Sequence, residues 1–373
     1  MKVSFRKHHL LNILNEYSKK NLPVDLFLRK YFKSNKSLGS KDRKEISENL
    51  YKLIRWRGLI DFLCIKKPIT FEERLDVLKN FDFKKFLKDE KIPTHIRVSF
   101  PKDYFEKVKN AYTHEKAIDF CLVSNSVAPT TIRTNLLKIS REELFEILNK
   151  KYVVEKCKKS SSGIIFKKKI NFFVSEEFKK GFFEIQDEGS QIVADLINPK
   201  PKDHVLDYCS GSGGKTLAFA HKMQKTGQIY LHDIRDHILL EAKKRFKRAG
   251  IENFQIKNTL QLEKLNKKMD FIILDVPCSG SGTLRRNPDL KWKFKLLEID
   301  NLIKTQRQIF DDAISYLKKD GKIIYITCSI FPDENEKQIK YFLDKYNLKI
   351  EKKFFSFPEK NSMDGFFGCI LGN

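Results

Sequence analysis

The sequence predicts an α/β fold, a doubly wound and mostly parallel sheet preceded by a small α+β module and an all-helical N-terminal domain. From about residue 186 onward, short apolar runs typical of buried strands alternate with helical stretches, as in open parallel sheets. Residues 1 to about 110 show helical periodicity, and β-branched and aromatic runs between about 118 and 185 fit an α+β module. We therefore expect three domains, at residues 1–115, 118–185 and 186–373.

The charge balance favours a polyanionic partner. The chain has 73 Lys and Arg residues against 48 Asp and Glu residues, which gives a formal net charge of +25. Such an excess is typical of proteins that bind nucleic acid, although coding bias toward lysine also produces it.

Other classes are disfavoured by what the sequence lacks. The first nine residues have no apolar core of a signal peptide, and no run approaches the roughly 18 apolar residues of a membrane helix. Seven scattered cysteines without a CxxC pair indicate neither a disulfide framework nor a metal site. We expect a cytoplasmic monomer that binds neither membrane nor metal.

In the helical part, apolar residues recur at helical spacing within residues 11–17 and 46–54. Ser40 is expected to cap the second helix, with Asp42 in its first turn. Four basic positions either contact phosphates or form a solvated face: Arg43, Lys44, Arg55 and Arg57.

In the α+β module, Ser140 and Glu143 predict a capping box for a helix over 141–150. Strands are expected at residues 152–154, 164–166 and 172–174. Lysines flank a predicted exposed hairpin, where they either bind a nucleic-acid backbone or face solvent: Lys156, Lys158, Lys159, Lys167, Lys168 and Lys169.

The expected strands of the parallel sheet are residues 205–207, 229–231, 254–256, 271–275 and 322–327. Helices are expected at 215–221, at 234–249 with Gly250 as a left-handed C-terminal cap, and at 297–317.

A glycine-rich loop follows the first of these strands and opens a helix, so its backbone N–H groups can approach a ligand. A phosphate-binding Walker A loop needs glycine at position 209, where Cys209 stands, and a dinucleotide fingerprint from Gly211 needs glycine at 216, where Thr216 stands. An acidic residue before a short glycine-rich loop, here Asp207, is typical of doubly wound methyltransferases that bind S-adenosylmethionine. Asp233, after the second strand, lies near the offset of a carboxylate that bonds a ribose.

Two cysteines follow neighbouring strands of the expected sheet. Residues 271–274 end in Asp275, after which Pro277 stops the ladder and Cys278 follows; Cys328 comes directly after the strand 322–327. If the first, fourth and fifth strands are adjacent, the cysteines lie about 5 Å apart on neighbouring strands and face the cofactor crevice. The alternative is that both are buried as small apolar residues.

The cysteine motifs resemble those of the Nop/Sun family of RNA cytosine-5 methyltransferases, most closely its bacterial small-subunit ribosomal RNA branch. The segments that carry the resemblance are 275–282, 285–289, 327–329 and 334–336, with 183–188 and 364–367 as flanking motifs. More loosely, residues 40–59 resemble the antiterminator-like helical domain of that branch, and 132–135 resemble its RNA-recognition-like module.

The resemblance implies RNA, most of all ribosomal RNA, as the partner and a covalent mechanism. Cytosine C5 is a poor nucleophile, so a thiolate first adds to C6. By position, Cys328 corresponds to this nucleophile and Cys278 to the cysteine that assists loss of the C5 proton and release. Asp275 would hold the N3/N4 edge, and as a donor to N3 it would have to be kept protonated by burial. Lys215 favours a thiolate, contacts the substrate or merely starts a helix.

The chain departs from the family pattern in two places. Gly211-Ser212 stands where the family has Ala-Pro, and Asn258 stands near the position of an aspartate that binds the adenine amino group. Asn258 is the substitute we expect. The expected cofactor-binding residues are Cys209, Ser210, Gly211, Ser212, Gly213, Gly214, Lys215, Asp233, Asn258 and Asp275.

Three alternatives stay open. A DNA cytosine methyltransferase uses the same addition chemistry but lacks a thiol equivalent to Cys328. Transfer RNA is the second substrate class to consider. A noncatalytic RNA-binding assembly factor would keep the fold without the chemistry.

Overall fold

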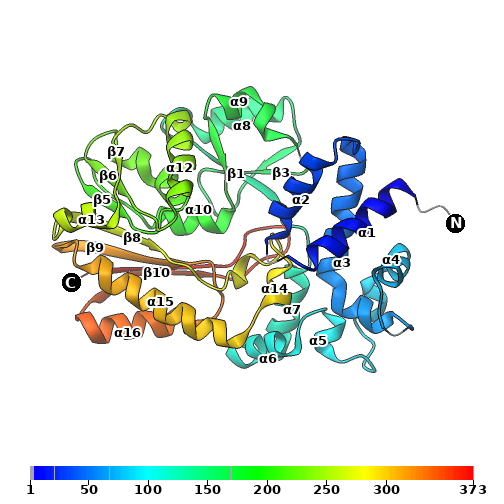
Figure 1. The fold of residues 1–373 in the computed structure, drawn as a ribbon. Coiled ribbons are helices and arrows are strands. Elements are labelled where there is room, and N and C mark those ends of the chain that lie inside the picture. Colours follow the sequence, from blue (N-terminus) through cyan, green and yellow to red (C-terminus); the bar gives the residue numbers. More distant parts are fainter. Residues whose placement is uncertain (1–3, 21, 67, 169, 373) are drawn as a thin grey trace. The chain divides into compact units, whose positions relative to one another are not determined.

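The computed structural model describes residues 4–372 except 21, 67 and 169 (Figure 1). The chain divides into two compact units, Met1–Val127 with Thr283–Leu296, and Ala128–Gly282 with Leu297–Asn373. In the described part of the chain, no helix is long and apolar enough to cross a membrane.

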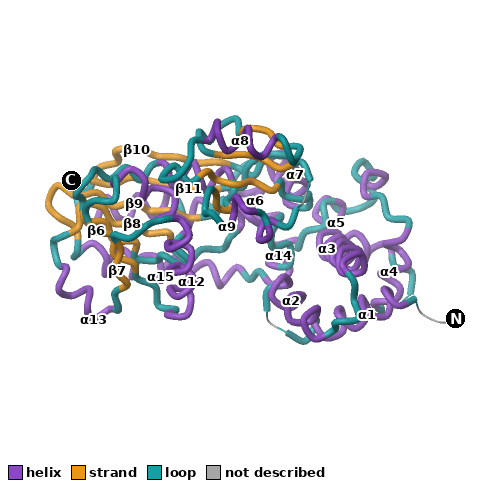
Figure 2. The backbone as a smooth tube through the Cα atoms, turned by 90° about the horizontal axis from the view of Figure 1, so that it is seen from above, coloured by secondary structure: helices purple, strands orange, loops and turns teal. Residues whose placement is uncertain are grey.

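The first unit consists of helices joined by loops, which are purple and teal in Figure 2. Its core holds buried residues such as Leu14, Leu50 and Leu53, on the two faces that the periodicity predicts. The elements are α1 (Phe5–Tyr17), α2 (Val24–Ser34), α3 (Ser40–Leu63), α4 (Phe71–Lys79), the 3₁₀ turn η1 (Phe83–Phe86), α5 (Thr94–Arg97), α6 (Lys102–Ala111), α7 (His114–Ser124) and α14 (Leu290–Lys293).

The start of α3 corrects the expected cap. Gly39, not Ser40, is the N-cap, and Ser40 is the first helical residue. The carboxylate of Asp42, in the first turn, accepts a hydrogen bond from the Gly39 N–H at 3.1 Å and so satisfies the backbone donor of the N-cap residue. Two of the basic positions serve this unit internally, since Arg43 donates to the Leu38 carbonyl and Arg55 to the Arg285 carbonyl.

Segment 283–296 belongs to the helical unit although it follows the Cys278 loop in sequence. Its Lys291 is buried, and the ammonium donates to the Ser99 carbonyl at 2.7 Å and to Asn125 Oδ1 at 2.5 Å. Trp292 Nε1 donates to the Ile54 carbonyl at 2.7 Å. Burial lowers the pKa of Lys291 well below its ordinary value. These hydrogen bonds satisfy the buried Lys291 nitrogen and attach the segment to the helical core.

The second unit begins with an antiparallel sheet of order β2-β3-β1-β4. The strands are β1 (Thr130–Thr134), β2 (Val154–Lys156), β3 (Gly163–Phe166) and β4 (Phe183–Ile185), with α8 (Arg141–Asn149) and α9 (Glu176–Lys179). The capping box of Ser140 and Glu143 is confirmed at the start of α8.

The expected strand at 172–174 is wrong, because these residues form the 3₁₀ turn η2 (Phe172–Val174). Phe172 buries its ring against Phe166 and Phe183, while Phe173 and Val174 are exposed. The Ser175 N–H donates to the Phe172 carbonyl and closes the turn, so the aromatic run forms a turn and not an extended strand.

The lysines around the β2–β3 hairpin are mostly on the surface. Lys156, Lys159 and Lys167 form ion pairs with Glu142, Glu359 and Glu155. Exposed pairs of this kind contribute little to stability and leave the charge accessible. Lys169 lies outside the described residues.

A seven-stranded sheet of order β10-β11-β9-β8-β5-β6-β7 forms the centre of the second unit. Its strands are β5 (His204–Asp207), β6 (Gln228–Leu231), β7 (Phe254–Ile256), β8 (Met269–Asp275), β9 (Leu317–Thr327), β10 (Lys349–Ser356) and β11 (Phe366–Gly372). The run from β9 to β7 is parallel, and β11 pairs antiparallel with β9 and β10.

Helices cover both faces of this sheet, with α10 and α12 on one side and α15 and α16 on the other (Figure 1). They are α10 (Glu188–Asp195), α11 (Gly214–Phe219), α12 (Asp236–Ala249), α13 (Thr259–Leu262), α15 (Leu296–Ile314) and α16 (Glu336–Tyr346), with 3₁₀ turns η3 (Ala220–Met223), η4 (Glu263–Leu265), η5 (Ser281–Thr283) and η6 (Pro332–Glu334). Gly250 ends α12 with φ +83°, as expected. The doubly wound, mostly parallel fold is thus confirmed.

Candidate active site

The carboxyl ends of β5, β6, β8 and β9 meet at one edge of the sheet. Parallel pairing sets Asp207 of β5 beside Ile273 of β8 and Asp275 of β8 beside Ile326 of β9. The loops after these strands therefore share one crevice, which is where open α/β sheets bind ligands.

The two thiols lie together at this edge. Cys278 Sγ and Cys328 Sγ are 3.4 Å apart, and both residues are only partly exposed. The hydrogen bond to Cys328, reinforced by burial, raises the pKa of the Cys278 thiol well above its ordinary value. A protonated Cys278 can donate a hydrogen bond to the Cys328 sulfur.

A cation and a carboxylate form an ion pair at the same edge of the sheet. Lys215 Nζ lies 2.8 Å from Asp275 Oδ2 and 3.3 Å from Ser190 Oγ, and it stands over the Phe366 ring. Lys215 also lies in the first turn of α11, which is one of the three roles considered for it. The Lys215 ammonium thus donates to one oxygen of the Asp275 side chain.

The loop after β5 is fixed by packing against Phe246 and by hydrogen bonds. Gly213 has φ +78°, and a Cβ at this position would come within 2.4 Å of the Phe246 ring, so only glycine fits. Asp207 is fully buried, and its Oδ2 accepts from Thr216 Oγ1 at 2.7 Å. Arg245 donates to the Ser212 carbonyl at 2.8 Å. These contacts fix the loop before any ligand binds.

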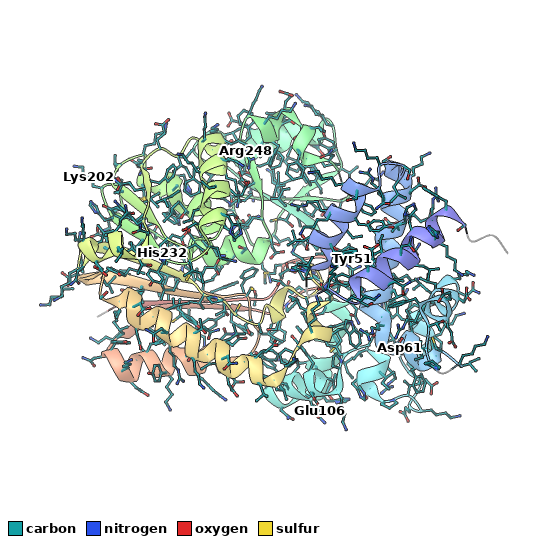
Figure 3. All side chains as sticks on the ribbon, viewed as in Figure 1. Tyr51, Asp61, Glu106, Lys202, His232 and Arg248 are labelled. Carbon is teal, nitrogen blue, oxygen red and sulfur yellow. The ribbon has the colours of Figure 1, made fainter. Side chains whose placement is uncertain are left out.

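Asp233 follows β6 and also holds this loop. It accepts from the Gly211 N–H at 2.9 Å and from the guanidinium of Arg235. Burial opposes ionisation of Asp233, but the hydrogen bonds from Arg235 and Gly211 outweigh it and lower the pKa. His232, labelled in Figure 3, precedes it, and the Ser210 N–H donates to the His232 carbonyl at 2.9 Å.

Asn258 lies after β7, one strand beyond Asp233. It is exposed, and its Oδ1 accepts from the Gln261 N–H at 2.9 Å as the N-cap of α13. The cap uses one lone pair of the amide oxygen, so one acceptor position and the NH₂ group remain for another role.

The flanking motifs also come together. Asp187 Oδ1 accepts from the Asp364 N–H at 2.9 Å, and Glu188 Oε1 accepts from the N–H groups of Lys159 and Ser160 at 2.7 and 3.0 Å. The carboxylates therefore attach the tip of the β2–β3 hairpin and the segment just before β11 to the N-terminal end of α10.

Sequence reasoning missed two polar contacts of the site. Ser190, which contacts Lys215, stands within the helix α10 and gave no separate signal. Glu334 belongs to a motif that carries the family resemblance, but nothing in the sequence predicts that its carboxylate bonds to both cysteine loops.

Comparison with known proteins identifies the family. Residues 194–371 match the family described as 16S rRNA methyltransferase RsmB/F, and residues 100–172 match the ferredoxin-like domain of RsmF/B-like methyltransferases. By these two matches, residues 100–172 and 194–371 of the chain belong to the RsmB/F methyltransferase family. The resemblance to Nop/Sun proteins is thereby confirmed, as is S-adenosylmethionine as the cofactor.

Individual relatives agree with this assignment. Ribosomal RNA small subunit methyltransferase B of Photorhabdus laumondii is 32% identical over 263 residues, which are 66% of this chain and 60% of that protein. The 25S rRNA (cytosine-C(5))-methyltransferase nop2 of Schizosaccharomyces pombe is 28% identical over 71% of this chain and 50% of its own length. The crystal structure of PH0851 covers all of both chains with a TM-score of 0.81 at 24% identity and so shares the fold.

The residues of this RsmB/F family chain fit the cofactor. Asp207 Oδ1 is buried and has no hydrogen-bond partner among the described residues, and Ser210 Oγ is in the same condition. Buried polar atoms of this kind are normally satisfied, and an acceptor beside a glycine-rich loop suits a ligand with ammonium and hydroxyl groups.

Replacing Asp207 with asparagine is expected to remove a pH dependence of stability. Burial raises the pKa of Asp207 from 3.8 to about 7. The native state therefore binds more protons than the unfolded state between about pH 4 and 7, so this residue's contribution falls as the pH rises through that window. Relative to the wild type, Asp207→Asn should gain stability between pH 5 and 8, by at most about 3 kcal/mol.

Urea unfolding of both proteins at several pH values measures this difference. Asp233→Asn is the matched control, because the lowered pKa of Asp233 places its titration below this window. Parallel stability curves for wild type and Asp207→Asn would contradict the prediction.

Proposed function

We propose that this chain transfers a methyl group from S-adenosylmethionine to C5 of cytosine in RNA, with ribosomal RNA as the favoured substrate. The observation that carries the proposal is the pair of thiols 3.4 Å apart, which follow β8 and β9 at the sheet edge that also holds the Lys215–Asp275 ion pair. The names of the relatives, which include a ribosomal RNA cytosine-C5 methyltransferase, support the same chemistry.

The cofactor would be held by the loop after β5 and by the ends of the neighbouring strands. When bound, S-adenosylmethionine supplies an electrophilic methyl group on a sulfonium. The residues proposed to hold it are Cys209, Ser210, Gly211, Ser212, Gly213, Gly214, Lys215, Asp233, Asn258 and Asp275. Asp207 supports this loop through Thr216.

The thiols supply covalent catalysis. Cys328 adds to C6 of the ring, which turns C5 into an enamine carbon nucleophilic enough to take a methyl group. The proton on C5 must then leave with help from Cys278, after which the bond between Cys328 and C6 breaks. A thiol 3.4 Å from the nucleophile is close enough to serve both events.

The ion pair would recognise the base. The Asp275 carboxylate accepts from the N4 amino group, and the Lys215 ammonium is a donor next to it, suited to the acceptor at N3. The target cytosine must leave its stack to reach this crevice.

The remaining modules are proposed to bind RNA. We assign residues 1–115 to a helical antiterminator-like domain, 118–185 to an RNA-recognition-like module and 186–373 to the catalytic domain. The net charge of +25 and the lysines of the hairpin suit a phosphate backbone. A cytoplasmic location and a monomeric state stay predictions.

Bisulfite sequencing of total RNA from cells with and without the gene tests the substrate. A ribosomal RNA cytosine that loses protection when the gene is deleted supports the proposal, and a transfer RNA cytosine would support the second substrate class. Titration calorimetry with S-adenosylmethionine tests the noncatalytic alternative, which predicts no binding.

A further inference from the structure

Glu334 is a buried carboxylate that bonds to both loops that carry the thiols. It is 0% exposed. One oxygen accepts from the Ser279 N–H at 2.8 Å, and the other accepts from the Ser279 and Ser329 hydroxyls at 2.5 Å each. Ser279 follows Cys278 and Ser329 follows Cys328 in the sequence. A single side chain therefore holds the residues next to both thiols.

Two neighbouring side chains extend this network. Gln306 on α15 donates from Nε2 to Glu334 at 3.1 Å and to the Pro277 carbonyl at 3.0 Å, directly before Cys278. The Tyr325 hydroxyl lies 2.8 Å from the backbone carbonyl of Glu334 and 3.0 Å from Gln306 Oε1. Gln306 thus braces the Cys278 loop, whereas Tyr325 touches only the backbone of Glu334.

The hydrogen bonds of the Glu334 carboxylate hold the Cys278 and Cys328 loops together. Its hydrogen-bond donors in the described part of the chain are uncharged, namely two hydroxyls, a backbone N–H and an amide. A buried carboxylate is costly unless its oxygens are fully bonded. If the Cys278 and Cys328 loops moved apart, Glu334 would lose donors from one of them. The energy that keeps the carboxylate satisfied therefore also opposes separation of the loops.

We propose that Glu334 is a positioning residue that keeps the Cys278 and Cys328 thiols within reach of one pyrimidine ring. It acts through Ser279 and Ser329 and touches neither substrate nor cofactor. The catalytic consequence rests on the proposed function, but the geometric claim does not. The 3.4 Å separation of the two sulfur atoms is the quantity that Glu334 maintains.

The test compares Glu334→Gln with Tyr325→Phe in the full chain. Glutamine has the shape of glutamate but offers one acceptor oxygen instead of two, so it cannot bind all the donors of the two loops. Tyr325→Phe removes buried hydrogen bonds of the same network while leaving the carboxylate contacts to both serines. The second variant therefore controls for a general loss of stability.

Two readouts are measured on each variant. Dibromobimane becomes fluorescent when it bridges two adjacent thiols, which reports the Cys278–Cys328 spacing without any methyl transfer, and Cys278→Ala gives the background. Steady-state kinetics with RNA report kcat and the KM for S-adenosylmethionine. Glu334→Gln should lose bridging and about 100-fold in kcat with little change in KM, since small misplacements of catalytic groups have effects of this size. Tyr325→Phe should keep both.

The outcomes separate the two claims. Bridging and kcat that both survive in Glu334→Gln, or that fall equally in Tyr325→Phe, would overturn the positioning role. If Glu334→Gln does not fold, the double variant Ser279→Ala/Ser329→Ala removes the same hydroxyl donors and is expected to lose bridging in the same way. Should the wild type methylate no cytosine, the proposed function fails while the bridging comparison still decides the role of Glu334.

Discussion

Cys328→Ala is expected to abolish methyl transfer to RNA, with a loss of roughly 10⁴-fold or more in turnover, as for other covalent nucleophiles. Without this thiol the ring cannot be activated at C6. The pKa of the neighbouring Cys278 thiol is raised by the hydrogen bond to Cys328 and by burial, and burial persists when Cys328 is replaced. Transfer of a tritiated methyl group to RNA measures the effect.

Cys328→Ser is the matched control for packing. It keeps the shape of the side chain but replaces the sulfur by a far less acidic hydroxyl, so it should be as inactive as Cys328→Ala. Both variants should bind S-adenosylmethionine with wild-type affinity in calorimetry. Full activity of Cys328→Ala would show that the roles of the cysteines are assigned wrongly.

Cys278→Ala is expected to accumulate a covalent complex of protein and RNA. Cys328 can still add to the ring, but the group that assists proton loss and release is gone, so the chain stays bound to its product. Incubation with RNA and S-adenosylmethionine should give a band of lower mobility in a denaturing gel, and the band should disappear on RNase treatment.

The double variant Cys278→Ala/Cys328→Ala decides whether that band has the proposed origin. It should form no covalent complex, because the attacking sulfur is missing. An adduct of equal yield in the double variant, or normal turnover without any adduct in Cys278→Ala, would rule out the proposed division of labour between the two thiols.

Local sequence patterns predicted the parallel sheet and the proximity of Cys278 and Cys328. Continuous apolar runs such as 271–275 read as buried parallel strands, and the usual strand order then places Cys278 and Cys328 side by side, as observed. Residues that directly follow parallel strands can be placed in this way, because the carboxyl ends of those strands lie at one edge of the sheet.

Features that depend on tertiary packing were not predictable. The strands β10 and β11 were missed: five of the eight residues of β10 are exposed, and its pattern is too polar to read as a buried strand. The segment 283–296 gave no sign that it belongs to the helical core, because that depends on partners for Lys291 that lie far away in the sequence. The Lys215–Asp275 ion pair joins residues 60 positions apart.

The predictions of a cap at Ser40 and of a strand at 172–174 failed for a different reason. Ser40 is a good N-cap by residue type, but Gly39 takes that place because Asp42 can reach its N–H. At 172–174 the residues are aromatic and β-branched, yet only Phe172 is buried. Burial of this one ring, and not the β propensity of the run, therefore determines the backbone conformation.

The central claim, that Cys328 is the sulfur that bonds to the base, is tested most directly by mapping a trapped adduct. RNA containing 5-fluorocytidine cannot lose its C5 substituent as a proton, so the wild-type protein should stay bound to it. Trypsin separates Cys278, in peptide 269–285, from Cys328, in peptide 323–337. The proposal predicts that mass spectrometry finds the nucleotide on peptide 323–337, and a nucleotide on peptide 269–285 would contradict it.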